Sequence, residues 1–292
     1  MDCFCGQKKE IGKNIAELFK GFEIRECQEC KQLYSYPPPV MKTIEAEVYQ
    51  EFNSRHQAIS EFDMNYARLN IHLLNGKNVL SKRFLDFGCG NGATLKAAKE
   101  LGMKSEGIEI NKNMAEYVRK QGFLVHASLN EVKEEKFDVV NISAVLEHLP
   151  AEEDILEELK KVIHVKTKVL INVPNYGSFA RRFFGKYWMG YRRYEHLWYF
   201  TPETIQYLIN KKGYKIEIIE QYPMGAGIDR HGSFVYESAG YLLDGQAFGI
   251  RIINAIIHCI DKMTGKNIGK FIRTRGPKKC GDQIFIVCSL LG

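Results

Sequence analysis

Three glycines, Gly88, Gly90 and Gly92, follow a short apolar run at residues 83–87 and precede a helical pattern. Glycine has no Cβ, so a turn of this kind lets main-chain N–H groups and a helix N-terminus come close to a ligand. The spacing Gly88-x-Gly90-x-x-Ala93 also fits the fingerprint of NAD enzymes, which accepts alanine at its third position. The turn therefore predicts a nucleotide-like cofactor at the carboxyl end of the first core strand.

Two carboxylates accompany this turn. Asp86 lies two residues before Gly88, inside the strand end, and Glu109 closes the apolar run Gly107-Ile108 about twenty residues downstream. A carboxylate in the second position can accept hydrogen bonds from both hydroxyls of a ribose. The turn and the two acids together favour a nucleoside-containing ligand.

A later strand-like run, Phe137-Asp-Val-Val140, leads into Leu146-Glu-His-Leu149. Together with Asp86-Phe-Gly-Cys-Gly-Asn-Gly92 and Glu109, these segments resemble the class I S-adenosylmethionine-dependent methyltransferases, over roughly residues 80–220 and the last strand. The resemblance implies an α/β fold with a doubly wound, Rossmann-like, seven-stranded and mostly parallel sheet. In that fold the last strand inserts antiparallel between earlier strands.

The resemblance also implies a site for S-adenosylmethionine. In it Asp86 orients the turn or the cofactor's ammonium, Glu109 takes the ribose hydroxyls, and Ile110 packs on the adenine. Such enzymes often carry an acidic residue just after the third strand, but Ser128 and Leu129 stand there in this chain. The implied cofactor-binding residues are Asp86, Gly88, Cys89, Gly90, Gly92, Glu109, Ile110, Ser128 and Leu129.

Methyl transfer from a sulfonium is an in-line displacement, so the enzyme must position a nucleophile and remove its proton. His196 is the first candidate for the general base, because histidine titrates near neutrality and the adjacent Glu195 could hold it. Sugar C-methyltransferases of similar appearance use a Glu-His pair at a comparable place. His148, on the loop after the strand at 137–142, is the second candidate. A structural role remains the alternative for both histidines.

Four of the eight cysteines lie in the first thirty residues, at Cys3, Cys5, Cys27 and Cys30. Two close pairs about twenty residues apart are the pattern of a zinc ribbon, in which four thiolates complete a tetrahedral site. Cys3 and Cys5 are separated by one residue only, which departs from the usual spacing and leaves Cys3 in question as a ligand. The alternative is a metal-free segment with free thiols, since disulfides are rare in cytosolic chains.

The chain divides around this core into a cysteine-rich, zinc-ribbon-like segment (1–40), a helical cap (41–80) and the methyltransferase domain (81–292). In the cap, Tyr66 or Arg68 could meet the methionine carboxylate of the cofactor. The domain alternates strand and helix patterns, which predicts a parallel sheet with helices on both faces. The expected strands are 83–87, 104–109, 123–127, 137–142, 167–173, 214–219 and 282–290, and the expected helices are 92–101, 112–121, 152–163 and 201–213.

Two insertions interrupt the domain, at about 175–200 and 222–281. The first is rich in aromatic and basic residues, and we expect both to lie over the carboxyl edge of the sheet as a substrate lid. Aromatic faces can stack on sugar rings, and arginines can pair with phosphate. Within the second, residues 241–264 form an amphipathic helical pattern, which could lie on a membrane surface but more commonly packs on the core or on a partner.

The absence of an apolar run of about 20 residues and of a signal-like N-terminus favours a cytoplasmic protein. The net charge of +6 indicates either simple solubility or an anionic substrate, such as a nucleotide-sugar diphosphate, a membrane surface or a nucleic acid. The expected function is methyl transfer from S-adenosylmethionine to a small molecule, most simply a sugar or nucleotide sugar of surface-glycan or secondary metabolism. A nucleic-acid methyltransferase is disfavoured because the Asn/Asp-Pro-Pro-aromatic motif is absent. An NAD-dependent oxidoreductase and a non-catalytic binding protein remain alternatives, and the acceptor atom and oligomeric state are left open.

Overall fold

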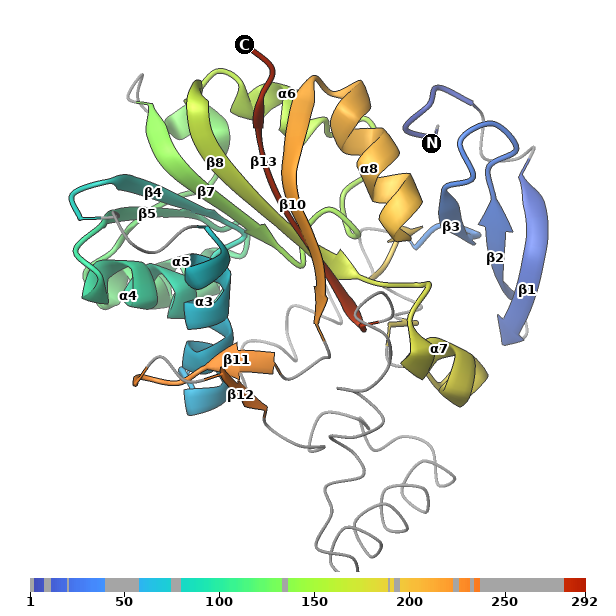
Figure 1. The fold of residues 1–292 in the computed structure, drawn as a ribbon, viewed down its shortest axis with the longest axis horizontal. Helices are drawn as coiled ribbons and strands as arrows, with labels where there is room; N and C mark the ends of the chain where they lie inside the picture. Colours follow the sequence, from blue (N-terminus) through green and yellow to red (C-terminus); the bar gives the residue numbers. More distant parts are fainter. Residues whose placement is uncertain are drawn as a thin grey trace, which may run out of the picture.

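The computed structural model describes residues 3–7, 12–19, 21–39, 58–74, 80–132, 136–188, 190–191, 195–222, 226–231, 234–236 and 281–292. A seven-stranded sheet lies at its centre (Figure 1), in the order β10-β13-β8-β7-β4-β5-β6. Its strands are β4 (Arg83–Phe87), β5 (Lys104–Ile108), β6 (Leu124–His126), β7 (Phe137–Ser143), β8 (Ile163–Pro174), β10 (Tyr214–Tyr222) and β13 (Gln283–Leu290). β13 runs antiparallel to both β10 and β8, while β4 to β8 pair in parallel. The predicted doubly wound sheet with an inserted last strand is confirmed.

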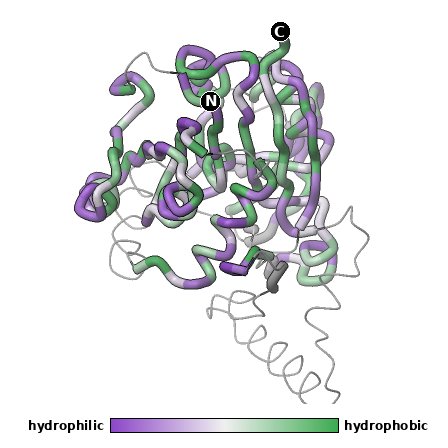
Figure 2. Tube along the Cα trace, turned by 60° about the vertical axis from the view of Figure 1, so that its left-hand side comes forward, coloured by the Kyte–Doolittle hydropathy of each residue, from purple (hydrophilic) through white to green (hydrophobic). Residues whose placement is uncertain are grey.

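Helices cover both faces of this sheet (Figure 1). On one side lie α3 (Glu61–Leu73), α4 (Ala93–Glu100) and α5 (Lys112–Lys120), and on the other lie α6 (Ile155–Leu159) and α8 (Pro202–Lys211). Side chains of β13 alternate between the two resulting cores: Ile284 and Ile286 belong to the α6 and α8 side, and Phe285 to the α3 and α4 side. This alternation is the two-residue period of a strand buried on both faces. In Figure 2 the strand that leads to the C-terminus, β13, is accordingly green over most of its length.

Capping side chains set where several helices begin. Ser60 and Asp63 form a capping box at the start of α3, and Asn111 accepts the main-chain N–H groups of the first turn of α5. Thr201 caps α8, whose first residue is Pro202, as the sequence predicts. Each cap satisfies N–H groups that the helix itself leaves unpaired, which fixes the loop-to-helix boundary.

Two predicted elements differ most in extent. The helix expected over 152–163 covers only Ile155–Leu159, because Asp154 is its N-cap and accepts from Glu157 N. The strand expected over 167–173 runs over Ile163–Pro174 and therefore takes the last residue assigned to that helix. The acidic residues Glu152 and Glu153 thus precede the helix instead of forming its first turn.

A second, four-stranded antiparallel sheet contains β1 (Lys13–Phe19), β2 (Phe22–Glu26), β3 (Leu33–Tyr36) and β9 (Trp198–Tyr199), in that order. β9 belongs to the segment after β8, and Leu33 and Tyr34 of β3 pair with Tyr199 and Trp198. The cysteine-rich segment is therefore hydrogen-bonded to the chain just before α8.

The aromatic residues assigned to a stacking lid are mostly buried instead. Trp188, Tyr199 and Tyr176 form one cluster with Phe22, Ile24 and Leu33 of the four-stranded sheet. Within the described part of residues 175–200, Phe179 and Phe183 remain exposed, on the short helix α7 (Phe179–Phe184). The apolar face of the N-terminal sheet therefore covers aromatic side chains that the sequence analysis expected to be exposed to a substrate.

Several predictions fall outside the described residues: the helical pattern at 241–264, most of the insertion at 222–281, and the first part of the helical cap. The remaining elements are the 3₁₀ turns η3 (Leu129–Glu131) and η4 (Gly185–Tyr187) and the hairpin of β11 (Ala226–Ile228) and β12 (Phe234–Tyr236). Among the helices described, none has the length and apolar character to cross a bilayer.

Candidate functional site

The glycine turn joins β4 to α4 and is tied to the end of β5. Gly88, Gly90 and Gly92 all have positive φ angles, of 76°, 50° and 83°. The main-chain N–H groups of Gly88 and Cys89 both donate to the carbonyl of Ile108. The turn therefore follows β5 closely and opens at the carboxyl edge of the sheet, where ligands of such folds bind.

Glu109 joins the two strand ends through its carboxylate. One oxygen accepts from Gly90 N at 2.9 Å and the other from Asn111 N at 2.8 Å. Burial raises the pKa of Glu109, while these two N–H donors oppose the rise. Since each carboxylate oxygen can accept two hydrogen bonds, Glu109 retains acceptor capacity for a pair of ribose hydroxyls.

We expect Gly88→Ala to weaken binding of S-adenosylhomocysteine at least about 10-fold and to cost about 1–2 kcal/mol of stability through its positive φ. A Cβ at Gly88 would also lie 2.6 Å from Cγ2 of Val145. Gly122→Ala is the matched control, because Gly122 has φ +83° and open space around its Cβ position. Calorimetric titration and urea unfolding should show both variants destabilised but only Gly88→Ala impaired in binding. If Gly88→Ala and Gly122→Ala bound S-adenosylhomocysteine with equal affinity, the glycine turn would not be part of the cofactor site.

Asp86 is buried at the end of β4, with 2% of its surface exposed. Asn141 on β7 donates its Nδ2–H to Oδ1 of Asp86 at 2.7 Å. Burial raises the pKa of Asp86 to about 7, with a smaller contribution from the charge of Glu109 and an opposing one from Asn141. The sequence places Asp86 at the site but gives no sign of Asn141, which lies on a different strand.

Asp86 makes the stability of the unliganded protein depend on pH. Its folded pKa lies above the unfolded value, so its protonated form favours folding, and this contribution is lost as pH rises through about 7. Asp86→Asn keeps an acceptor for Asn141 but cannot ionise. We therefore expect the free energy of unfolding of Asp86→Asn, minus that of the natural chain, to be about 2–3 kcal/mol larger at pH 8 than at pH 5. Urea unfolding at both pH values measures the difference, and a constant difference would contradict the pKa.

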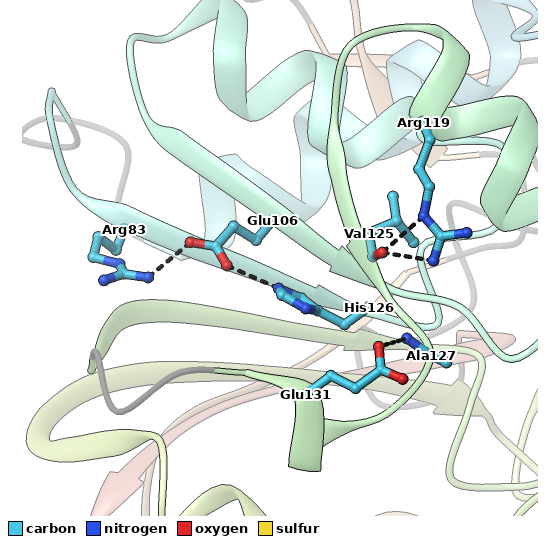
Figure 3. Close-up of polar contacts among 7 residues, drawn as sticks. All are labelled: Arg83, Glu106, Arg119, Val125, His126, Ala127 and Glu131. Atoms are coloured by element: carbon cyan, nitrogen blue, oxygen red, sulfur yellow. Dashed lines mark hydrogen bonds and ion pairs between the residues drawn. The ribbon is translucent and has the colours of Figure 1, made fainter.

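The predicted adenine side is formed by the ends of β5 and β6. Ile110 is 69% exposed, Leu129 is buried, and Ser128 is half-buried. Figure 3 shows Glu131 here as well, with its carboxylate accepting from Ala127 N at 2.8 Å. Glu131 is thus an acidic residue of the turn η3, three residues after Ser128, and its carboxylate is bonded to the main chain of the loop after β6.

Behind this edge, a chain of polar contacts links three neighbouring strands (Figure 3). Arg83 of β4 donates to Glu106 of β5 at 2.7 Å, and the other oxygen of Glu106 lies 3.1 Å from Nε2 of His126 on β6. Arg119 of α5 donates twice to the carbonyl of Val125. These contacts fix the strand ends that carry Glu109 and Ser128.

Tyr66 reaches the same edge from α3. Its hydroxyl donates to Oδ1 of Asn172 on β8 and lies 3.3 Å from Oγ of Ser143 at the end of β7. Arg68, the other residue considered for the methionine carboxylate, forms an ion pair with Glu61 at 3.1 Å. Tyr66 therefore lies among polar groups at the carboxyl ends of the strands, whereas Arg68 also donates to Asn65 of the same helix and lies 3.9 Å from Glu100 of α4.

The two predicted catalytic histidines lie together although they are 48 residues apart. The rings of His148 and His196 meet edge to face, with centroids 4.7 Å apart. Nδ1 of His196 is 3.0 Å from the carbonyl of Gly190, and Nδ1 of His148 is 3.1 Å from the carbonyl of Glu195. Carbonyl oxygens only accept, so Nδ1 carries the proton in each neutral ring and Nε2 carries the lone pair. Glu195 thus positions His148 through its main chain.

Glu147, which the sequence analysis treated only as a neighbour of His148, completes this group. Its carboxylate is buried, and its Oε1 lies 3.9 Å from Nε2 of His148. Its main-chain carbonyl accepts from Leu197 N at 2.8 Å and from Trp198 N at 3.2 Å. The loop after β7 and the segment around His196 are therefore held together by main-chain bonds, which a sequence does not show.

The four N-terminal cysteines form one cluster, Cys3 included. The Sγ atoms of Cys3 and Cys30 are 3.4 Å apart and those of Cys5 and Cys27 are 3.5 Å apart, with all four ligand atoms within 4.8 Å of one another. Four sulfurs at about 2.3 Å from a zinc ion would have comparable mutual distances, so the donor set fits tetrahedral zinc. The hydrogen bond between Cys3 and Cys30 lowers the pKa of Cys30 and raises that of Cys3, so one proton is shared by this pair, and a bound metal would replace it.

The cysteine cluster contacts the segment that carries His196. Phe4, between Cys3 and Cys5, packs on Trp198 with ring centroids 4.1 Å apart. Nε1 of Trp198 donates to the carbonyl of Leu149, in the loop of His148, at 2.7 Å. A continuous set of contacts thus runs from the cysteines to both histidine segments.

The chain matches the family model described as a methyltransferase domain over residues 55–218. It is 24% identical over 173 residues to an uncharacterized protein of Methanocaldococcus jannaschii, a match covering 58% of this chain and 78% of that one. It is 26% identical over 135 residues to the ubiquinone biosynthesis O-methyltransferase of Vibrio cholerae, covering 43% of this chain. The match spans about half of that enzyme's length, at 53%.

Solved structures show the same fold. A SAM-dependent methyltransferase from Archaeoglobus fulgidus superposes with a TM-score of 0.52 at 22% identity, covering 84% of this chain and 100% of that one. The 1,6-didemethyltoxoflavin-N1-methyltransferase of Burkholderia thailandensis, solved with S-adenosylhomocysteine, gives 0.52 at 11% identity, with coverage of 95% and 99%.

Proposed function

The chain belongs to the methyltransferase-domain family of S-adenosylmethionine-dependent enzymes, and we propose that it methylates a hydroxyl of a small-molecule acceptor. The observation that carries the proposal is the pair of histidines beside the glycine turn. His148 N donates to the carbonyl of Val145, whose side chain packs at the Cβ position of Gly88. The loop of His148 therefore borders the turn that would hold the cofactor's amino-acid part.

In this proposal Asp86, the glycine turn and Glu109 hold the cofactor, with Ile110, Ser128 and Leu129 at the adenine. When bound, S-adenosylmethionine supplies an electrophilic methyl group. Nε2 of His196 or His148, the ring nitrogen with the lone pair, acts on the acceptor hydroxyl and lowers the cost of removing its proton. The 26% identity to an O-methyltransferase supports oxygen as the methylated atom.

For the acceptor class, we propose a sugar or nucleotide sugar. The support is the surface of α7, which follows the carboxyl end of β8 and exposes Phe179 and Phe183 beside Arg182. Phe179 and Phe183 stack on each other, with centroids 6.1 Å apart. An apolar ring surface with a cation beside it suits a sugar ring that carries a phosphate.

Zinc in the cysteine cluster completes the proposal. Cys3, Cys5, Cys27 and Cys30 would hold it, and it would stabilise the N-terminal sheet that packs on Trp198. A reducing compartment such as the cytoplasm, which we propose for this protein, would keep these four cysteines available to the metal.

The experiment is a screen of nucleotide sugars, free sugars and phenolic acceptors with methyl-labelled S-adenosylmethionine. We expect transfer to at least one acceptor, and a loss of kcat of about 100-fold or more in His196→Gln with unchanged affinity for S-adenosylhomocysteine. If neither His196→Gln nor His148→Gln changed the rate of methyl transfer, neither histidine would take part in catalysis. Binding of the cofactor with no transfer to any acceptor would favour a non-catalytic protein.

A further inference from the structure

Glu147, His148 and His196 bring three metal-binding groups to one point. One ligand atom from each lies within 4.8 Å of the others. Glu147 and His148 come from the loop after β7, and His196 comes from the turn before β9. Zinc binds nitrogen and oxygen ligands at about 2.0–2.2 Å, so a cation between these atoms requires the side chains to close by about 1 Å.

Both histidines are already oriented as metal ligands are. Each donates Nδ1–H to a main-chain carbonyl, His148 to Glu195 and His196 to Gly190. A hydrogen bond of this kind fixes the tautomer and leaves Nε2 to bind the metal. One ring nitrogen of each histidine lies within 4.8 Å of a carboxylate oxygen of Glu147.

Burial of the group favours a cation and leaves one side of it open. Glu147 is 1% exposed and His196 is 5% exposed, whereas the side chain of His148 is 31% exposed. A dication would compensate the negative charge of the buried carboxylate. Two histidines and one carboxylate, with a further position left open, are the ligand set of catalytic zinc sites, in which substrate or water takes the fourth place.

We propose that Glu147, His148 and His196 bind a divalent transition-metal ion of the zinc type, and that this ion receives the oxygen of the acceptor. The inference rests on the proposed function and specifies how its histidines act. The bound cation lowers the pKa of the acceptor hydroxyl, whose proton leaves to solvent. The oxygen then forms a bond to the methyl carbon while the carbon–sulfur bond breaks, which gives the methyl ether and S-adenosylhomocysteine.

The test uses the full chain with zinc left in the cysteine cluster, titrated with Co²⁺ after treatment with a mild chelator. We expect one additional Co²⁺ per chain, with an absorption spectrum free of sulfur-to-cobalt charge transfer. Glu147→Gln and His148→Gln should each weaken Co²⁺ binding about 100-fold or more. His164→Gln is the matched control, because His164 also faces a carboxylate, Asp138 at 3.4 Å, but lies away from this group. No additional Co²⁺, or equal affinity in all variants, overturns the inference.

Turnover separates this inference from the proposed function. Methyl transfer that proceeds at the same rate after chelation would leave the proposed function standing and overturn the role of the cation. Cobalt binding that depends on Glu147 and His148, without transfer to any acceptor, would support the metal site and overturn the proposed function. Glu147→Gln preserves the shape of its side chain, and an unchanged affinity for S-adenosylhomocysteine shows that the variant is folded.

Discussion

Replacing Glu109 by alanine is expected to lower the affinity for S-adenosylhomocysteine by about 100- to 1,000-fold. The two ribose hydroxyls of the cofactor would lose the carboxylate to which they donate. Each hydrogen bond to a charged acceptor contributes about 1.5–3 kcal/mol, so the loss amounts to about 3–4 kcal/mol once water partly replaces the carboxylate. The loss also removes the acceptor for Gly90 N and Asn111 N, so the turn itself loosens. Calorimetric titration of the purified chain measures the change.

Two variants separate ribose binding from the shape of the turn. Glu109→Gln keeps one acceptor oxygen and should lose only about 10-fold in affinity. Glu116→Ala on α5 is the control, because Glu116 forms a surface ion pair with Lys120 that contributes little. An affinity of Glu109→Ala within about threefold of the natural chain would contradict the assignment, and NADH binding in the same titration would contradict the cofactor.

The affinity should also fall at mildly acidic pH. Ribose hydroxyls donate to the ionised carboxylate, and burial raises the pKa of Glu109, so protonation sets in at a higher pH than for an exposed glutamate. The natural chain should therefore bind S-adenosylhomocysteine more weakly as pH falls through that raised pKa. Glu109→Gln should show a flatter profile.

The cofactor side of the site could be predicted because its residues are close in sequence to strand ends. Gly88 and Glu109 each follow a buried strand directly, and parallel strands end at one edge. The cross-strand contact of this site could not be predicted, since Asn141 reaches Asp86 from β7, which is far from β4 in the sequence. The spacing of residues in the sequence shows that a residue lies at the carboxyl edge of the sheet. The residues that it contacts depend on the register between neighbouring strands, which the sequence does not show.

The surroundings of the aromatic segment at residues 175–200 could not be predicted from the sequence. Its composition suggested an exposed stacking surface, yet Trp188 and Tyr199 lie against Phe22 and Leu33 from the first forty residues. An apolar pattern shows that a surface needs covering and does not show which part of the chain covers it. The same limit applied to Glu147, whose role depends on the return of the chain at His196.

Loss of the cysteine cluster is expected to reduce methyl transfer without removing cofactor binding. In Cys27→Ser we expect loss of at least one equivalent of zinc and a fall in kcat of about 10- to 100-fold, while the affinity for S-adenosylhomocysteine changes by less than about threefold. The reason is positional, because Phe4 packs on Trp198, and Trp198 is bonded to both Glu147 and Leu149. The glycine turn and Glu109 are held by β4 and β5 instead.

Fluorescence reports the same event independently of turnover. The chain has two tryptophans, and both Trp188 and Trp198 are buried against the N-terminal segment. Cys27→Ser should therefore shift the emission to longer wavelength as water reaches these rings. Cys288→Ser is the control: Cys288 is buried outside the cluster and donates to the carbonyl of Val169, which serine can also do. If Cys27→Ser kept both its emission and its kcat, the cysteine cluster would have no part in positioning His196.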